Sequence, residues 1–103
     1  RRFLERNRRT CFVAEQAGRV AGAILSGHDG RRGYIYHTAV EAALQRQGLG
    51  SALVLAVQEA LRKEGITKIA LVAFKRNALG NRFWERQGFS RRDDLVYRNK
   101  RLL

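Results

Sequence analysis

The sequence contains no proline, no methionine and a single cysteine, Cys11. One cysteine excludes an internal disulfide framework and is typical of a protein in a reducing, cytoplasmic setting. Because it lies in the apolar run Cys11–Ala14, we interpret Cys11 as a buried packing residue rather than a nucleophile. The absence of methionine, and therefore of an initiator, indicates a fragment or a trimmed chain.

Long apolar runs and metal-binding clusters are also absent. The apolar runs are far too short to cross a bilayer, and no signal-peptide core lies at the start. No grouping of histidine, cysteine and glutamate has the spacing of a zinc site, so no metal is expected. With 103 residues and 45% hydrophobic residues, the chain is expected to form one domain with a single modest core.

Acidic residues are scarce: nine face 21 lysines and arginines, which gives a formal net charge of +12. Such a charge attracts anionic cofactors, acidic substrates and polyanions. The cations are nevertheless spread along the chain, with clusters in residues 1–9, 31–32 and 91–92. No zinc finger, basic heptad region or aromatic RNA-binding motif accompanies them. We therefore interpret the charge mainly as a solvated surface and do not expect nucleic acid as a partner.

The first 40 residues have the pattern of a small sheet. Strands are predicted over residues 10–15, 20–28 and 34–40, with turn signals at Gly18 and at Asp29-Gly30. Three consecutive strands with short connections predict an antiparallel meander.

The pattern becomes helical in the second half of the chain. Apolar residues at helical spacing predict a helix over residues 49–64, and a strand over residues 68–74 would follow it in a right-handed parallel crossover. A second helix is predicted over residues 77–87. A last strand is predicted over residues 89–97, interrupted by a turn or bulge at Asp93-Asp94.

The segment Gln45–Ser51 lies between the third strand and the first helix. Gly48 and Gly50 let backbone N–H groups approach a ligand closely, and a helix that begins there adds the positive end of its dipole. Arg46 adds a charge, and the glutamines on either side of it add donors. These features suit a pyrophosphate. A tight strand-to-helix turn explains the two glycines equally well, because a short glycine motif is not specific.

Three sets of residues stand in order along the chain. Thr38-Ala39-Val40 ends the third strand, the Gln45–Gly50 loop matches Q/R-x-x-G-x-G/A, and Asn77 precedes a helix that ends in Gly88-Phe89. Together they resemble the GNAT superfamily of acetyl-CoA-dependent N-acetyltransferases, over nearly the whole chain from Cys11. The implied fold is α+β and three-layer α/β/α-like, with a mixed, largely antiparallel sheet and one parallel β-α-β crossover.

The resemblance also implies a coenzyme site. Residues 47–51 and Arg46 would hold the pyrophosphate of acetyl-CoA, while Thr38 and Val40 would pair with its pantetheine arm. Asn77 would donate a hydrogen bond to this arm, or would act only as a helix N-cap, and both roles stay open. The implied coenzyme-binding set is Thr38, Ala39, Val40, Gln45, Arg46, Gln47, Gly48, Leu49, Gly50, Ser51, Asn77 and Phe83.

Catalytic groups are less clear from the resemblance. Relatives often have a tyrosine, the acid toward the thiolate, where this chain has Trp84, which we interpret as a core residue or a tunnel wall. Tyr97 could replace this acid, although a structural edge-strand tyrosine is the simpler interpretation. Strand alternation places Thr38 on the face of Tyr36 and puts His37 on the other face. Tyr36 is therefore the leading acceptor-side candidate, against a half-buried structural tyrosine.

The implied activity is direct transfer of an acetyl group from acetyl-CoA to a primary amine in a ternary complex. The amine would belong to a small molecule, an amino acid or a protein. The domain would cover residues 1–103 and lack the strand and helices with which GNAT domains usually begin. GNAT domains often form homodimers, and exposed sheet edges would favour one here.

A different class of function also fits the sequence. A non-catalytic module that binds acyl-CoA or a polyanion would keep the glycine loop and lose the acid. The net charge and Trp84 favour this module, whereas the strand, loop and asparagine motifs favour the enzyme.

Overall fold

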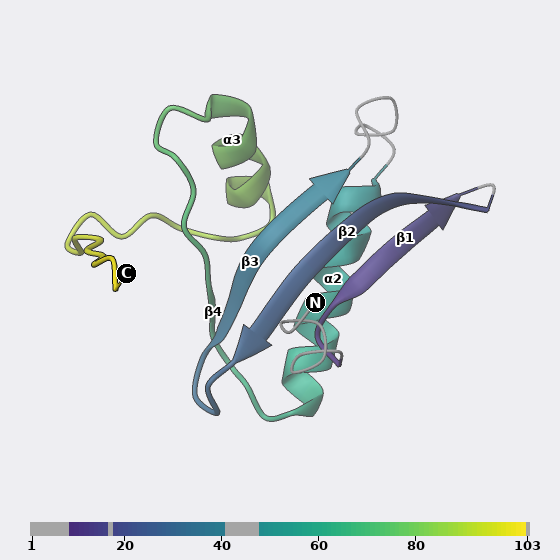
Figure 1. The fold of residues 1–103 in the computed structure, drawn as a ribbon, viewed down its shortest axis with the longest axis horizontal. Coiled ribbons are helices and arrows are strands. Elements are labelled where there is room, and N and C mark those ends of the chain that lie inside the picture. Colours follow the sequence, from purple (N-terminus) through teal and green to yellow (C-terminus); the bar gives the residue numbers. More distant parts are fainter. Residues whose placement is uncertain (1–8, 17, 41–47, 103) are drawn as a thin grey trace.

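The structure is a computed structural model that describes residues 9–16, 18–40 and 48–102. Figure 1 shows a single sheet with one helix across its face and a second helix beside the end of its third strand. The elements in chain order are β1 (Phe12–Gln16), β2 (Arg19–His28), β3 (Gly33–Val40), α2 (Leu49–Lys63), β4 (Ile69–Ala70) and α3 (Ala78–Arg86).

The sheet has the strand order β1-β2-β3-β4. β2 pairs with β1 and with β3 in antiparallel fashion, whereas β4 pairs with β3 in parallel. The predicted meander and the parallel pairing across α2 are therefore confirmed.

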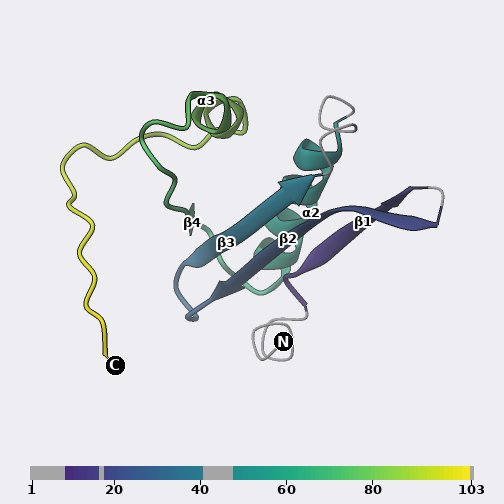
Figure 2. The same cartoon turned by 45° about the horizontal axis from the view of Figure 1, so that its top comes forward.

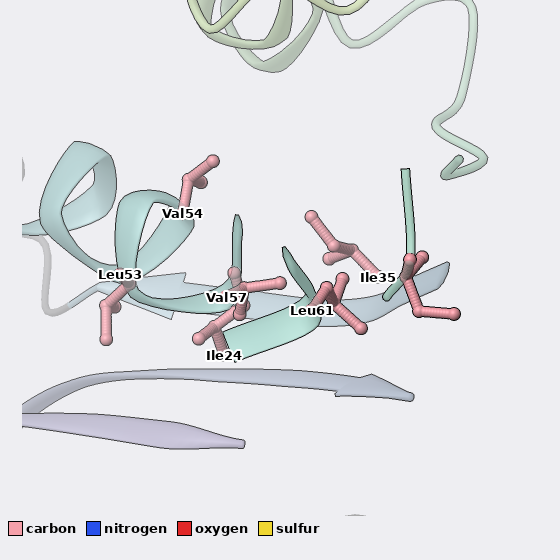
Figure 3. Packing of buried hydrophobic residues seen from close by; sticks show 7 residues of the cluster. Ile24, Ile35, Leu53, Val54, Val57 and Leu61 are labelled. Carbon is pink, nitrogen blue, oxygen red and sulfur yellow. The ribbon is translucent and has the colours of Figure 1, made fainter. Parts of the chain in front are cut away.

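One face of α2 builds the core against the sheet (Figure 3). Its buried residues repeat at helical spacing, as expected for a helix with one apolar side. They pack against Ile24 of β2 and Ile35 of β3, which are both buried. These buried residues of α2 are Leu53, Val54, Val57 and Leu61.

The start of β1 is tied to β2 by short polar side chains. The hydroxyl of Thr10 donates to the carbonyl oxygen of Ser26 at 2.7 Å, and the hydroxyl of Ser26 donates to the carbonyl oxygen of Thr10. Cys11 is half-buried, and its Sγ lies 3.5 Å from the same Ser26 oxygen. Its packing beside this buried pair agrees with the predicted structural role.

β3 contains a β-bulge at Tyr36. Ser26 of β2 pairs with Ile35, but its neighbour Leu25 pairs with His37, so Tyr36 is one extra residue on β3. Two residues of the bulged strand then face one residue of the partner strand, and the alternation of faces shifts by one beyond that point.

The bulge corrects the predicted faces of β3. Ile35 is buried beneath α2, and beyond the bulge Thr38 lies opposite the fully buried Ile24. His37 pairs instead with Leu25 and is exposed. The prediction that Thr38 shares the face of Tyr36 was therefore wrong. Thr38 faces α2, and His37 joins Tyr36 on the outer face of the sheet.

β4 is much shorter than the strand predicted over residues 68–74. Its ladder consists of Gly33 paired with Ile69 and Tyr34 paired with Ala70. The chain beyond Ala70 has no ladder partner in the described part, and a strand is defined by such pairing. The prediction recognised the apolar run but not the point at which β3 and β4 separate.

The prediction of a last strand over residues 89–97 was wrong. This segment is irregular, and beyond the half-buried Phe89 it is exposed, with exposed fractions of 61% at Leu95 and 68% at Tyr97. Asp93 and Asp94 form the expected turn, and each carboxylate pairs with the arginine two residues before it, at 3.3 and 2.8 Å. These local ion pairs hold the chain in a turn, and no neighbouring strand among the described residues extends it.

Between β2 and β3, the carboxylate of Asp29 organises the turn. Its Oδ1 accepts hydrogen bonds from the backbone N–H groups of Arg31 and Arg32, both at 2.9 Å. These bonds favour the ionised carboxylate, so the pKa of Asp29 is lowered from 3.8 to about 2.

Candidate functional site

β3 and β4 separate directly beyond Tyr34 and Ala70, their last paired residues. In Figures 1 and 2, β3 continues toward its end near α3 while the chain after β4 follows a separate course to α3. The other edge of β3 stays paired with β2 as far as Val40. This arrangement suits an extended ligand that enters between the two parallel segments and hydrogen-bonds to β3.

The N-terminus of α2 lies at the end of β3 where the two strands are apart. Gly48 precedes the helix in a left-handed conformation, with φ 80° and ψ 5°, and among the described residues no side chain makes a hydrogen bond that caps the first turn. The first N–H groups of a helix have no partner within it and carry the positive end of the dipole. A Cβ on Gly48 would meet no atom of the described residues within 4 Å. As far as the described residues show, this end of α2 leaves its first N–H groups available to an anion.

The second glycine of the loop motif has a different role. A Cβ built on Gly50 would lie 3.2 Å from Cε1 and Cζ of Phe83 and 3.9 Å from Cγ2 of Val40. Gln87 Nε2 donates to Ser51 Oγ at 2.8 Å. α3 is thus held against the first turn of α2, and Gly50 makes room for the contact. The predicted ligands Gln45, Arg46 and Gln47 lie outside the described residues.

Two polar side chains of the predicted coenzyme set have donor or acceptor groups to spare. Thr38 Oγ1 is buried and has no hydrogen-bond partner in the described part of the chain. Asn77 Oδ1 accepts from the N–H of Gly80 at 3.1 Å and so caps α3. The Asn77 amide nitrogen is not needed for this cap. Of the remaining members of the set, Ala39 is exposed and Leu49 is half-buried.

Tyr34, Tyr36 and His37 lie on the outer face of β3. The rings of Tyr34 and Tyr36 have their centroids 4.9 Å apart and are tilted by 58°. Burial raises the pKa of Tyr34, Tyr97 and Tyr36 raise it further, and Arg32 acts in the opposite direction. Strand alternation in the sequence placed His37 on the opposite face of β3, away from Tyr34 and Tyr36. Only strand pairing reveals the bulge that moves it.

The two predicted catalytic tyrosines differ in their settings. Tyr36 is 59% exposed within the bulge, and Tyr97 is 68% exposed in the irregular segment after α3 rather than on a strand. Trp84 packs edge-on against Phe83 and Phe89, with centroid distances of 4.9 and 5.4 Å. It is half-buried against the core, which agrees with its interpretation as a packing residue.

Two further properties of the described residues concern the binding of a metal ion and the spanning of a membrane. They contain no group of three or more histidine, cysteine, aspartate or glutamate side chains that could hold a metal ion. Neither of their helices has the length and apolar character needed to cross a membrane.

These features together define an acetyltransferase fold. The family model described as "Acetyltransferase (GNAT) family" matches residues 1–89, and the chain belongs to this family. The four-stranded mixed sheet with its two helices is consistent with the GNAT α+β fold.

Individual proteins with similar sequences or structures agree with this assignment. An acetyltransferase of Sodalis glossinidius is 32% identical over 92 residues, which cover 89% of this chain and 65% of that protein. Ard1 from Thermoplasma volcanium is 26% identical, with a TM-score of 0.82 over 86% of this chain and 61% of that chain. An aminoglycoside N-acetyltransferase in complex with CoA is 18% identical, with a TM-score of 0.76 over 88% and 75% of the two chains. The chain thus spans slightly less than two thirds of the first two proteins.

Proposed function

We propose that this chain is an N-acetyltransferase domain that transfers the acetyl group of acetyl-CoA to a primary amine by direct attack in a ternary complex. The observation that carries the proposal is the separation of β3 and β4 beside the uncapped N-terminus of α2. The separation of the strands offers a strand edge to which an extended pantetheine arm can hydrogen-bond. The N-terminus of α2 offers backbone N–H groups to a pyrophosphate. Membership of the GNAT family supports the same reaction.

The residues present fit acetyl-CoA in two respects. The buried Thr38 hydroxyl lacks a partner among the described residues, and none of their atoms would lie within 4 Å of a Cβ on Gly48. Thr38 and Val40 would hold the pantetheine arm, and the Asn77 amide nitrogen would donate to it. The N–H groups from Gly48 to Ser51 would hold the pyrophosphate. When bound, the coenzyme supplies an activated thioester.

On the acceptor side, Tyr36 and His37 are the proposed catalytic residues. Both lie on the outer face of β3 next to the point where the strands part. Tyr36 would orient the amine, and His37 would accept its proton, since an imidazole commonly acts as a general base. A backbone N–H near Val40 would stabilise negative charge that develops on the thioester oxygen. Tyr97 is the proposed proton donor to the departing thiolate, with solvent as the alternative.

Thermal unfolding with acetyl-CoA, CoA and duplex DNA at two salt concentrations tests the proposal. We expect acetyl-CoA and CoA to raise the midpoint at both salt concentrations. Gly48→Trp should abolish this rise, because its side chain would occupy the anion site. A midpoint that responds only to DNA, and only at low salt, would support the polyanion-binding alternative instead. If the coenzyme binds, thiol release over a panel of amines then tests catalysis.

A further inference from the structure

A groove with a volume of about 1180 Å³ runs beside β4, between α2, α3 and the segment after α3. Its lining is strongly basic: Glu85 is its single carboxylate among the described residues, against six cationic side chains. Such an excess of one sign raises the local concentration of oppositely charged ligands. The six cations are Arg32, Arg62, Lys68, Lys75, Arg91 and Arg92.

The six cations differ in whether they are neutralised. Arg62, Arg91 and Arg92 pair with Glu59, Asp93 and Asp94 respectively. The other three, Arg32, Lys68 and Lys75, make no ion pair with any described residue. These three are therefore the cations available to a ligand.

Arg32 and Lys68 lie together at the end of the groove where β3 and β4 are still paired. Arg32 directly precedes Gly33, whose N–H donates to the carbonyl oxygen of Lys68 at 2.8 Å. A Cβ on Gly33 would touch Leu61, near the C-terminus of α2. The 15 residues of α2 span about 22 Å, and the pyrophosphate site is proposed at the opposite end. Arg32 and Lys68 are thus distant from the coenzyme's pyrophosphate.

The same two cations lie within reach of the acceptor side. Tyr34 lines the groove with Arg32, and its ring contacts the ring of Tyr36 on the outer face of β3. The four residue-to-residue steps from Tyr36 to Arg32 span about 13 Å in an extended chain. An amine beside Tyr36 and His37 would need a chain of three or four residues to carry a carboxylate to Arg32. A single amino acid is too short.

We propose that the acceptor is the amine of an acidic peptide, whose carboxylate side chains within the first few residues bind Arg32 and Lys68. This inference rests on the proposed acetyltransferase function and names its acceptor class. Tyr34, which also lines the groove, would contact the peptide between its amine and its carboxylates.

Three matched peptide amides test this inference: Ala-Glu-Glu-Glu, Ala-Gln-Gln-Gln and Ala-Arg-Arg-Arg, each with acetyl-CoA, with thiol release as the readout. We expect the glutamate peptide to have a kcat/KM about tenfold above that of the glutamine peptide, which corresponds to two exposed ion pairs, one with Arg32 and one with Lys68. The advantage should shrink at high salt. Free glutamate should gain no comparable advantage over glutamine.

Two variants and one matched control locate the effect. Arg32→Gln and Lys68→Gln should each lower the ratio of kcat/KM for the glutamate peptide to kcat/KM for the glutamine peptide. Arg31→Gln should leave this ratio unchanged, because Arg31 is 86% exposed and pairs with Asp29. Urea midpoints of all three variants report whether the fold is retained, and Lys68→Gln serves if Arg32→Gln fails to fold.

Several results would overturn the inference. Equal rates with the glutamate and glutamine peptides, or a preference for the arginine peptide, would do so while leaving the acetyltransferase function intact. A loss of acetyl-CoA affinity in Arg32→Gln would assign Arg32 to the coenzyme instead. If acetyl-CoA fails to raise the unfolding midpoint of the unmodified chain, the proposed function itself is wrong, and the acceptor class is rejected with it.

Discussion

The ring of Phe83 on α3 occupies the space that a side chain at Gly50 on α2 would need. A Cβ built on Gly50 would lie 3.2 Å from two ring atoms, closer than ordinary van der Waals contact. Residues 33 positions apart therefore depend on each other. Through this contact α3 is held beside the helix N-terminus at which an anion is proposed to bind.

Replacing Gly50 by valine should separate the two helices. We expect Gly50→Val to lower the free energy of unfolding by about 1–3 kcal/mol, because overpacking forces the ring to move. Ala52→Val is the matched control, since Ala52 is exposed in the same turn and should cost only about 0.5 kcal/mol of helix propensity. The cost of Gly50→Val should fall in a Phe83→Leu background, and strictly additive effects in urea titrations would contradict the contact.

Two substitutions at Asn77 separate its cap from its proposed ligand role. Asn77→Ala removes the acceptor for the Gly80 N–H and should cost about 1 kcal/mol of stability. Asn77→Asp keeps an acceptor oxygen and places a negative charge at the helix N-terminus, so stability should be retained. If the amide nitrogen donates to the coenzyme, Asn77→Asp should still weaken acetyl-CoA binding. Unchanged affinity, measured by calorimetry, would leave Asn77 as a cap alone.

Substitutions at the bulge of β3 test the proposed acceptor side. Tyr36→Phe and His37→Gln should each lower kcat, by about 10²-fold or more for His37→Gln if the imidazole accepts the proton of the amine. Both should leave acetyl-CoA affinity unchanged, because the two side chains lie on the face away from α2. Full activity in both variants would indicate that ordered water, rather than these two side chains, deprotonates the amine.

The turn at Asp29 should depend on pH in a defined direction. Its pKa is lowered to about 2 in the folded protein, so its contribution to stability is complete above its ordinary pKa and is lost as the pH falls through 2. We therefore expect wild type to unfold at a higher temperature than Asp29→Ala at pH 7, with a gap that narrows between pH 4 and pH 2. Asp29→Asn keeps an acceptor oxygen and should show no such narrowing relative to Asp29→Ala. A gap that is constant down to pH 2 would contradict this assignment.

Much of the fold follows from local patterns in the sequence. The helix predicted over residues 49–64 is found over Leu49–Lys63, and the three predicted strands of the meander are found within two residues of their expected bounds. These predictions succeeded because apolar periodicity and turn residues act between near neighbours in the chain.

The errors share one physical cause. The faces of β3 beyond Tyr36, the length of β4 and the state of residues 89–97 all depend on which strand lies alongside and in which register. An apolar alternating run favours an extended chain, but pairing decides whether that chain is a strand and where its side chains point.

The candidate site divides in the same way. The sequence by itself determined the order of the elements, the turn at Gly48 and the cap at Asn77, since each depends on a few adjacent residues. Tertiary structure alone decided that Gly50 accommodates Phe83, that Thr38 turns toward α2 and that His37 joins Tyr36. These relationships arise from packing and cross-strand register between distant segments, which no local pattern records.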